Sequence, residues 1–276
     1  MKKIIWISSY PKSGNTWMRY LIANYFFNNK MKFDPNVIRY IDGLEFPKEI
    51  NKLNKNNKHD VKHISKFWIP AQERFKVHNG QVAFIKNHNA NLSIDGRDFT
   101  NEKYSIAIIY IVRDPRDVIV SGHHYFGSDY DKLIYDICNE EYFTIHNNSG
   151  NLQVLSTWDM HFKSWIHKMP NLPKILIRYE DLIQSTENVF KDTIIFLSKI
   201  LKFQVNEQKI EFSIQNSNFK KLSKMEDEIG FKENSGIGTK FFRKGEVGQY
   251  FNELTKKQIS ILNKRFEKEM KFLKYL

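Results

Sequence analysis

One stretch of sequence, the first seventeen residues, restricts the possible folds of this chain more than any other. It begins with a short apolar run, Lys3-Ile4-Ile5-Trp6-Ile7-Ser8, and continues with Tyr10-Pro11-Lys12-Ser13-Gly14-Asn15-Thr16-Trp17. Apolar side chains then recur at spacings of one, three and four, which places on one face of a helix the residues Trp17, Met18, Leu21, Ile22, Tyr25 and Phe26. We therefore predict a strand, a tight loop and the start of a helix.

The predicted loop combines several features of an anion-binding site. A helix start offers unpaired backbone N–H groups and the positive end of the helix dipole. Gly14 lets the backbone approach a ligand closely, Lys12 adds a positive charge, and Ser13 and Thr16 add hydroxyl donors. We predict that this loop binds a phosphate-type anion. The alternative is an ordinary turn in which Ser13 or Thr16 caps the helix, but it does not explain a lysine inside the turn.

Length and composition set broad limits on the class of protein. A chain of 276 residues with 41% hydrophobic residues suits one sizeable α/β domain, or at most two small ones. The net charge of +12 favours anionic partners such as a nucleotide, an acidic substrate, nucleic acid or a membrane surface, although much of the lysine suits solvated surface. Cys138 is the only cysteine, which fits a reducing compartment. The sequence has no apolar run of about 18 residues, so no membrane-spanning helix is expected.

A second apolar strand is expected at residues 81–88, and it ends in Lys86-Asn87-His88. Ligands of parallel sheets gather at the carboxyl ends of the strands, so Lys86 and His88 are candidates for catalysis. The alternative for a single histidine such as His88 is a surface or hydrogen-bonded role without chemistry.

A third strand, expected at residues 104–112, runs into Arg113. Its nearly continuous apolar character is typical of a strand covered on both faces. Pro115 suits the first turn of a following helix, which would be capped by Asp114. Arg113 at the strand end and Ser121 two turns into this helix could then bind one anion together, because the guanidinium fork matches two phosphate oxygens. The alternative is that Arg113 pairs with Asp114 or Asp117.

The remaining segments are assigned from periodicity and turn residues. Residues 28–62 are expected to form a loop-rich insertion, and residues 220–240 a mobile lid. A fourth strand is expected at 174–182, and helices are expected at 70–77 with Pro70 in the first turn, 129–146, 152–168, 187–201, 206–219, and 255–273 with Thr255 as its cap.

Four short motifs, taken in chain order, resemble those of the PAPS-dependent sulfotransferases. They are the loop at residues 10–17, Lys86-Asn87-His88, the segment from Arg113 to Ser121, and Arg243-Lys244-Gly245-Glu246-Val247-Gly248. Asn15 and Asn87 depart from residues that are usual in the family. The resemblance covers nearly the whole chain. It implies a three-layer, P-loop-like α/β fold with a central, mostly parallel sheet flanked by helices, and a single domain over residues 1–276.

The resemblance also implies a reaction and a set of roles. A sulfuryl group would pass from PAPS to a hydroxyl or amine of an acceptor, leaving the product nucleotide PAP. His88 would act as the general base, and Lys12 and Lys86 would stabilise negative charge around the transferred group. The residues that would bind PAPS are Lys12, Ser13, Gly14, Asn15 and Thr16 near the 5′-phosphate, Arg113, Ser121, Arg243, Lys244 and Gly245 near the 3′-phosphate, and Trp17, Tyr179, Ser217 and Phe219 near the adenosine.

Two other classes of function stay open from the sequence. An atypical P-loop nucleotide kinase would need its lysine after the last glycine and an acidic Mg²⁺ site, whereas Lys12 precedes Gly14. A non-catalytic nucleotide-binding protein is the other class, and nucleic acid is not expected because the basic residues fall in separate loops. We expect no metal requirement and a cytoplasmic location. The acceptor, whether a small molecule, a lipid or a glycan, and the oligomeric state are not determined by the sequence.

Overall fold

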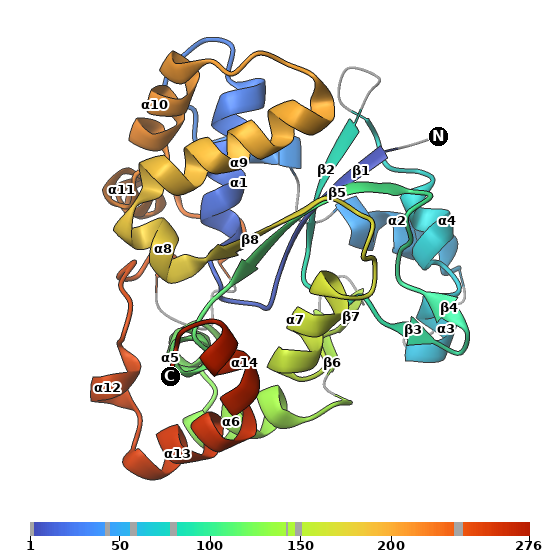
Figure 1. Cartoon of the computed structure of the whole chain (residues 1–276), viewed down its shortest axis with the longest axis vertical. Coiled ribbons are helices and arrows are strands. Elements are labelled where there is room, and N and C mark those ends of the chain that lie inside the picture. The colour runs from blue at the N-terminus through green and yellow to red at the C-terminus, as the bar shows by residue number, and fades with distance from the viewer. Residues whose placement is uncertain are drawn as a thin grey trace. The chain divides into compact units, whose positions relative to one another are not determined.

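The computed structural model describes residues 3–41, 45–55, 60–77, 82–141, 143–146, 151–234 and 240–276. Its central sheet has four strands in the order β2-β1-β5-β8 (Figure 1). These strands are β1 (Lys3–Ser9), β2 (Val82–Asn87), β5 (Ser105–Val112) and β8 (Lys174–Arg178). β1 pairs in parallel with both β2 and β5. The predicted α/β class with a parallel central sheet and flanking helices is therefore confirmed.

The strand register aligns the carboxyl ends of β1, β2 and β5. Ser8 of β1 lies opposite Asn87 of β2, and Ser9 lies opposite Ile111 of β5. Parallel strands that are paired in this way end at the same edge. The chain leaves the three strands at Tyr10, His88 and Arg113.

The chain divides into two compact units. The first unit comprises Met1–Tyr10, Ile41–Ile111 and Ile137–Leu176, and the second comprises Pro11–Tyr40, Val112–Asp136 and Ile177–Leu276. The single domain implied by the family resemblance stays a prediction. In the described part of the chain, every helix is too short or too polar to cross a membrane.

The first unit is built around the buried indole of Trp6. This side chain is fully buried, and its Nε1 donates a hydrogen bond of 2.9 Å to Ser105 Oγ. Aromatic rings pack around it with centroid distances between 5.5 and 6.5 Å, namely those of Phe46, Phe75, Phe99 and Trp165. Burial of this many large rings is the main source of stability for a unit of this kind.

The smaller elements of the first unit differ from the sequence prediction in three places. The elements are α2 (Glu45–Leu53), α3 (Val61–Ser65), α4 (Trp68–Gln72), the hairpins β3 (Ser93–Ile94) with β4 (Arg97–Asp98) and β6 (Phe143–His146) with β7 (Asn151–Val154), and α7 (Trp158–Ile166). The helix predicted at 70–77 is replaced by α4, which begins at Trp68 and already ends at Gln72. Pro70 is its third residue, where a missing N–H costs nothing because the first four N–H groups of a helix have no helical acceptor.

The helices predicted at 129–146 and 152–168 both prove shorter. The first is α6 (Tyr130–Cys138), and its expected end is instead strand β6. The second begins only at Trp158, where Thr157 caps it by accepting a hydrogen bond from Met160 N. The antiparallel pairing of β6 with β7 explains both errors, because its backbone hydrogen bonds join residues that a local pattern does not connect.

The second unit is mainly helical. Figure 1 shows α10 beside both α1 and α9. The helices are α1 (Asn15–Phe27), α5 (Pro115–Phe126), α8 (Tyr179–Gln184), α9 (Thr186–Leu201), α10 (Glu207–Asn216), α11 (Phe219–Ile229), α12 (Tyr250–Glu253), α13 (Lys256–Arg265) and α14 (Glu267–Phe272), and a 3-10 helix, η1 (Val37–Ile41), lies at the unit boundary. Asp114 caps α5 and Thr255 caps α13, as predicted.

Three predictions in the second unit are corrected. The fourth strand ends at Arg178 rather than at residue 182, because α8 begins at Tyr179. The predicted lid at 220–240 is largely the helix α11, while its residues 235–239 lie outside the described residues. The closing helix is interrupted at Phe266, a fully buried residue whose backbone leaves the helical region between α13 and α14.

Candidate active site

The loop between β1 and α1 has the backbone geometry of an anion cradle. Lys12 and Gly14 both have left-handed backbone conformations, with φ of 67° and 96°. Among the described residues, no side chain caps the start of α1. A Cβ atom on Gly14 would lie 2.6 Å from Cδ2 of Tyr179, so only glycine fits under this ring. A helix start without a side-chain cap suits an anionic ligand, because the first N–H groups of a helix have no acceptor within the helix.

Ser13, in the same loop, is fully buried, and its hydroxyl has no hydrogen-bond partner among the described residues. Such a group costs roughly 1–3 kcal/mol in desolvation unless a partner is supplied. A phosphate-type anion would supply that partner. The donor set of this loop thus fits the nucleotide that the sequence predicts.

Arg113 joins this loop to two other predicted binding segments within the second unit. Its Nη1 donates to the carbonyl of Lys12 at 3.1 Å, and its Nη2 donates to the carbonyl of Glu246 at 3.0 Å. The guanidinium also lies over the ring of Tyr179, 4.4 Å from its centroid. The structure therefore brings the backbone of Lys12, the side chain of Arg113 and the ring of Tyr179 together.

Asp117 holds the segment that follows the Arg243-Lys244-Gly245 motif. Its Oδ2 accepts a hydrogen bond of 2.7 Å from Gly248 N, and its Oδ1 accepts one of 3.1 Å from Tyr250 N. It also lies 3.7 Å from Arg113, so one of the two pairings considered for that arginine is present. From the sequence, Asp117 was expected only as a possible partner of Arg113. An aspartate one helical turn after Arg113 is the sequence feature that could have indicated this second role.

The Arg243-Lys244-Gly245 motif is the second glycine-bearing loop of the second unit. Gly245 has φ of 65°, and a Cβ atom there would lie 2.6 Å from Cδ2 of Phe219. Arg243 donates to the side chain of Gln249, while Lys244 is exposed. Phe219 and Gly245 are thus brought together as the predicted nucleotide site requires.

The predicted adenosine residues are close neighbours, with one difference. The rings of Trp17 and Tyr179 meet edge to face at 6.3 Å. Trp17 Nε1 donates to the backbone carbonyl of Ser217 at 2.8 Å. Ser217 itself is fully buried, and its hydroxyl accepts a hydrogen bond from Asn24. Ser217 therefore supports Trp17 through its backbone, and its side chain is not open to a ligand. Ser121, on α5, is half-buried.

An acidic residue that the sequence analysis missed lies against the anion loop. Glu233 accepts two hydrogen bonds from the buried Arg19, at 2.8 and 3.0 Å, and one of 3.4 Å from Thr16 Oγ1. Its carbonyl accepts a hydrogen bond of 2.5 Å from Tyr125, whose ring lies 3.6 Å from the amino group of Lys12. No local pattern marks Glu233, because its partner Arg19 lies far away in sequence.

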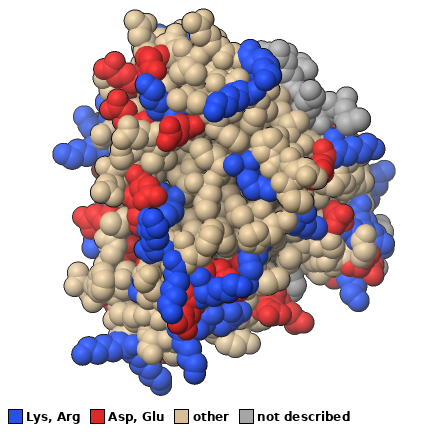
Figure 2. Space-filling view, in the orientation of Figure 1, with Lys and Arg blue, Asp and Glu red and all other residues tan. Residues whose placement is uncertain are grey.

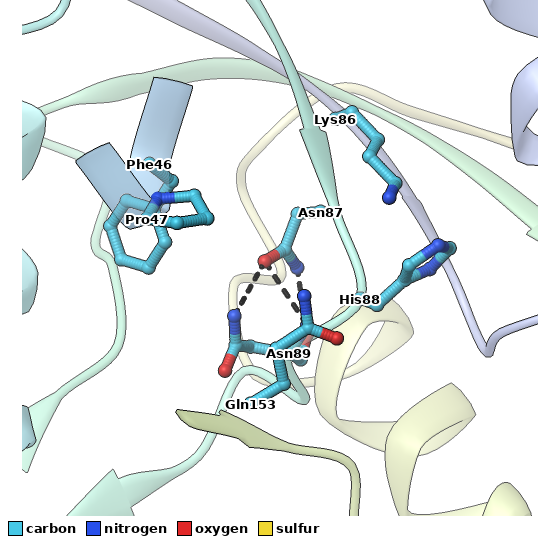
Figure 3. A pocket seen from close by; sticks show the side chains of 7 residues that line it. All are labelled: Phe46, Pro47, Lys86, Asn87, His88, Asn89 and Gln153. Carbon is cyan, nitrogen blue, oxygen red and sulfur yellow. Dashed lines mark hydrogen bonds between the residues drawn. The ribbon is translucent and has the colours of Figure 1, made fainter. Parts of the chain in front are cut away.

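The first unit contains a small pocket beside the predicted catalytic residues (Figure 3). Figure 3 shows Lys86 and His88 on one side of the strand and Asn87 on the other, as alternation along a strand requires. Asn87 Nδ2 donates to the carbonyl of Asn89 at 2.8 Å, and its Oδ1 accepts from Asn89 Nδ2 at 3.1 Å. Asn87 is therefore occupied in shaping the turn. The pocket is lined by Phe46, Pro47, Lys86, Asn87, His88, Asn89 and Gln153.

His88 is oriented by the backbone of Ser9, at the end of β1. His88 Nδ1 and the carbonyl oxygen of Ser9 are 2.8 Å apart. A carbonyl oxygen only accepts, so Nδ1 carries the proton of this hydrogen bond. In the neutral ring, Nε2 is then the nitrogen with the lone pair.

Charges on the surface are mixed. Figure 2 shows Lys and Arg side chains interspersed with Asp and Glu on the visible face. Within the described ranges, no three His, Cys, Asp or Glu side chains are grouped so that they could hold a metal ion.

Comparisons with known proteins agree with this fold and these motifs. Residues 2–274 match the family model of the sulfotransferase domain. Cytosolic sulfotransferase 15 of Arabidopsis thaliana is 25% identical over 268 residues, which are 93% of this chain and 69% of the relative. Amine sulfotransferase of Oryctolagus cuniculus is 22% identical, over 97% of this chain and 80% of the relative. A crystal structure of retinol dehydratase, in complex with androsterone and the inactive cofactor PAP, superposes with a TM-score of 0.64, 18% identity and coverage of 98% and 82%.

The family match spans nearly the whole chain, so the chain belongs to the sulfotransferase domain family. Its fold is the P-loop-like α/β fold of these enzymes. The protein is a PAPS-dependent sulfotransferase.

Proposed function

We propose that the protein transfers the sulfuryl group of PAPS to a hydroxyl or amine of an acceptor, with His88 as the general base. The observation that carries this proposal is the 2.8 Å contact between His88 Nδ1 and the carbonyl of Ser9. Because this contact fixes the proton on Nδ1, the neutral ring presents Nε2 as a base. Nε2 would take the proton of the acceptor as the new bond to sulfur forms and the bond from sulfur to the 5′-phosphate oxygen breaks.

The groups that bind the donor nucleotide would come from the second unit. In the described part of the chain, the Ser13 hydroxyl has no hydrogen-bond partner and no side chain caps α1, which supports binding of the 5′-phosphate by Ser13, Gly14, Asn15 and Thr16. Arg113, Arg243 and Lys244 are proposed for the 3′-phosphate, together with Ser121 and the backbone of Gly245. The retinol dehydratase structure contains PAP, which supports a nucleotide of this type.

The remaining roles concern charge and stacking. Lys12 and Lys86 would neutralise negative charge on the sulfuryl oxygens and on the leaving phosphate. Trp17, Tyr179 and Phe219 would flank the adenine, since aromatic faces stack on a base. Ser217 would act through Trp17, because its backbone carbonyl holds the indole N–H. The transferred group carries little net charge, so we propose that no metal ion is needed.

The acceptor is proposed to be a small molecule, a lipid or a glycan that carries a hydroxyl or an amine. Relatives are named for amine and steroid acceptors, including 3-alpha-hydroxysteroid sulfotransferase of Cavia porcellus. The Arabidopsis relative is named as cytosolic, which supports a cytoplasmic location for this chain. The mixed charges on the visible face do not favour a nucleic-acid partner.

Donor binding is tested by calorimetry with PAP. Tight binding is expected, and Arg113→Ala should weaken it by about 100-fold, because it removes a phosphate ligand and the link between two loops. Arg97→Ala, on an exposed hairpin, is the control and should leave the affinity unchanged. Equal and weak binding of PAP and ATP would contradict the nucleotide assignment.

Catalysis is tested with radiolabelled PAPS, first against panels of phenols, alcohols, amines, glycans and lipids to identify an acceptor. His88→Asn should then retain PAP affinity while the rate of transfer in a single turnover falls by about 10²–10⁴-fold, the usual contribution of a general base. Near-normal transfer by this variant would remove His88 from the role.

A further inference from the structure

A fully buried histidine on α7 lies behind the candidate base. His161 has no exposed surface. Its Nε2 is 3.0 Å from the backbone carbonyl oxygen of His88, and its Nδ1 is 2.8 Å from the hydroxyl of Tyr110 on β5. These three residues belong to the same unit and form one continuous chain of hydrogen bonds.

Donor and acceptor roles in this chain are determined by its ends. The carbonyl of His88 only accepts, so His161 Nε2 carries a proton. Burial lowers the pKa of His161 to about 4, which keeps the ring neutral near pH 7 and leaves a lone pair on Nδ1. Tyr110 is also fully buried, and burial raises its pKa, so its hydroxyl keeps its proton and donates it to Nδ1. The direction of both hydrogen bonds is therefore fixed.

The backbone of His88 needs such a partner because of its place in the fold. Strand β2 ends at Asn87, and the last register pair with β1 joins Ser8 to Asn87. The carbonyl of His88 therefore lies just beyond the sheet ladder. His161 supplies the hydrogen bond that an adjacent strand would otherwise supply.

We propose that His161, with Tyr110 behind it, is a positioning residue for His88. The backbone of His88 is held by His161, and its ring is held by Ser9, so both parts of the residue are fixed. This inference rests on the proposed role of His88 as base. Displacement of a reacting group by about 1 Å can cost about 100-fold in rate, so loss of the buried contact should appear in catalysis.

The test compares substitutions at position 161 in the full chain. His161→Leu removes both hydrogen bonds while keeping an apolar side chain, and kcat should fall by at least about 10-fold. His161→Gln can donate from its amide nitrogen to the His88 carbonyl and accept from Tyr110 with its amide oxygen, so it should recover most of that loss. In both variants the Kd for PAP should stay within about twofold of the parent value, because no nucleotide-binding group is touched.

A matched control lies on the same helix. Ser164 is also buried, and its Oγ accepts a hydrogen bond of 2.9 Å from Asn91 N and donates one of 2.8 Å to the backbone carbonyl of His161. Ser164→Ala therefore disturbs the backbone of α7 next to His161 while leaving the imidazole in place. Ser164→Ala should lower thermal stability but leave kcat unchanged. If His161→Leu does not fold, His161→Asn replaces it, because its shorter side chain cannot span both partners and should give a lower kcat than Gln.

The outcomes separate this inference from the proposed function. Unchanged kcat in folded His161→Leu, together with an inactive His88→Asn, would overturn the positioning role and leave the base in place. Equal loss in the Leu and Gln variants would also overturn it, because packing alone would then explain the effect. Full activity of His88→Asn would instead remove the base itself, and the positioning role with it.

Discussion

The ring of Phe219 lies directly on the backbone of Gly245, where an added Cβ atom would be 2.6 Å from Cδ2 of the ring. Tyr179 covers Gly14 at the same distance. Both glycines also have positive φ, so their conformation and the space around them each exclude a side chain. Two aromatic rings proposed to flank the adenine are thus seated on the two loops proposed to bind its phosphates.

Gly245→Ala should therefore weaken nucleotide binding. The new methyl group must displace Phe219, and we expect a loss of about 10-fold or more in PAP affinity, measured by calorimetry. Gly230→Ala is the matched control, because Gly230 has φ of 74° but nothing within 4 Å of an added Cβ. Both variants should lose stability through backbone strain, by about 1–3 kcal/mol. Equal PAP affinity in the two would show that the contact with Phe219 does not shape the site.

Asp117→Asn should also reduce PAP affinity, although Asp117 is not expected to touch the nucleotide. The carboxylate accepts from both Gly248 N and Tyr250 N, whereas an amide has one oxygen and would leave one N–H unpaired. We expect a loss of about 10-fold from the loosened loop. Asp227→Asn, on the exposed face of α11, is the control and should bind PAP normally.

Glu233→Gln should strengthen binding of PAP. In the structure, the Glu233 carboxylate accepts from Thr16 Oγ1 and Arg19, close to the loop proposed to hold the 5′-phosphate. Two negative charges near one another repel, so removal of one should raise the affinity by several-fold to about 10-fold at low salt, and less at high salt.

The control for this variant is Glu228→Gln, an exposed residue near Lys224 on α11. The buried Arg19 retains a hydrogen-bond acceptor in Glu233→Gln, so the protein should stay folded. Weaker PAP binding by this variant would mean that Glu233 supports the loop rather than opposes the ligand.

Much of this architecture could be predicted from local sequence, because the relevant signals are short. The apolar run before Lys12 and the helical spacing after Gly14 predicted β1, the loop and α1 to within two residues. The ends of the second and third apolar runs correctly predicted that His88 and Arg113 directly follow strands β2 and β5. These features depend on the conformational preferences of residues that are neighbours in sequence.

The features that were not predicted depend on distant partners. Strand β6 forms because its backbone pairs with β7, for example Phe143 with Val154. The sequence of either segment taken alone fits a helix equally well. Glu233 gains its role from Arg19 and Thr16, and His161 gains its role from His88 and Tyr110. The partners of Glu233 and His161 lie far outside any local window of sequence. Phe143 and Val154 lie closer together, but whether their segments are helical or extended depends on the pairing between them.

Glu180→Gln should change the pH dependence of stability. Burial is the main cause that raises the pKa of Glu180, while hydrogen bonds from Asp114 N and Tyr275 partly oppose it. Because the pKa of Glu180 is raised in the folded state, its contribution to the free energy of unfolding is complete below the ordinary pKa of a glutamate. That contribution is lost as pH rises through the folded-state pKa. The Tm of the variant relative to the parent should therefore rise with pH across that window.

The contrast for this measurement is Glu267→Gln. Glu267 is exposed and its pKa is lowered, chiefly by a hydrogen bond from Lys271. Its stabilising contribution is present above the ordinary pKa and is lost as pH falls, so its variant should lose Tm relative to the parent as pH rises. Parallel pH profiles for the two variants would show that the buried environment of Glu180 has no effect on folding.

Ser13→Ala should stabilise the ligand-free protein while weakening nucleotide binding. The buried hydroxyl has no partner among the described residues, so its removal relieves a desolvation cost of about 1 kcal/mol or more. Thermal melts with and without PAP measure both effects in one experiment. Ser164→Ala, whose hydroxyl is paired, should lose stability instead. A less stable Ser13→Ala protein would show that the hydroxyl already has a partner.

The order of strands in the sheet has a consequence for how the protein is made. β1 lies between β2 and β5, and the first strand that pairs with it begins only at Val82. At ribosomal speeds of about 5–20 residues per second, the apolar segment around Trp6 waits roughly 4–15 s for that strand to be synthesised. During this interval an unpaired, apolar strand is exposed to neighbouring chains. Yield of this enzyme in an expression host should therefore depend on chaperone supply and on slow synthesis at low temperature.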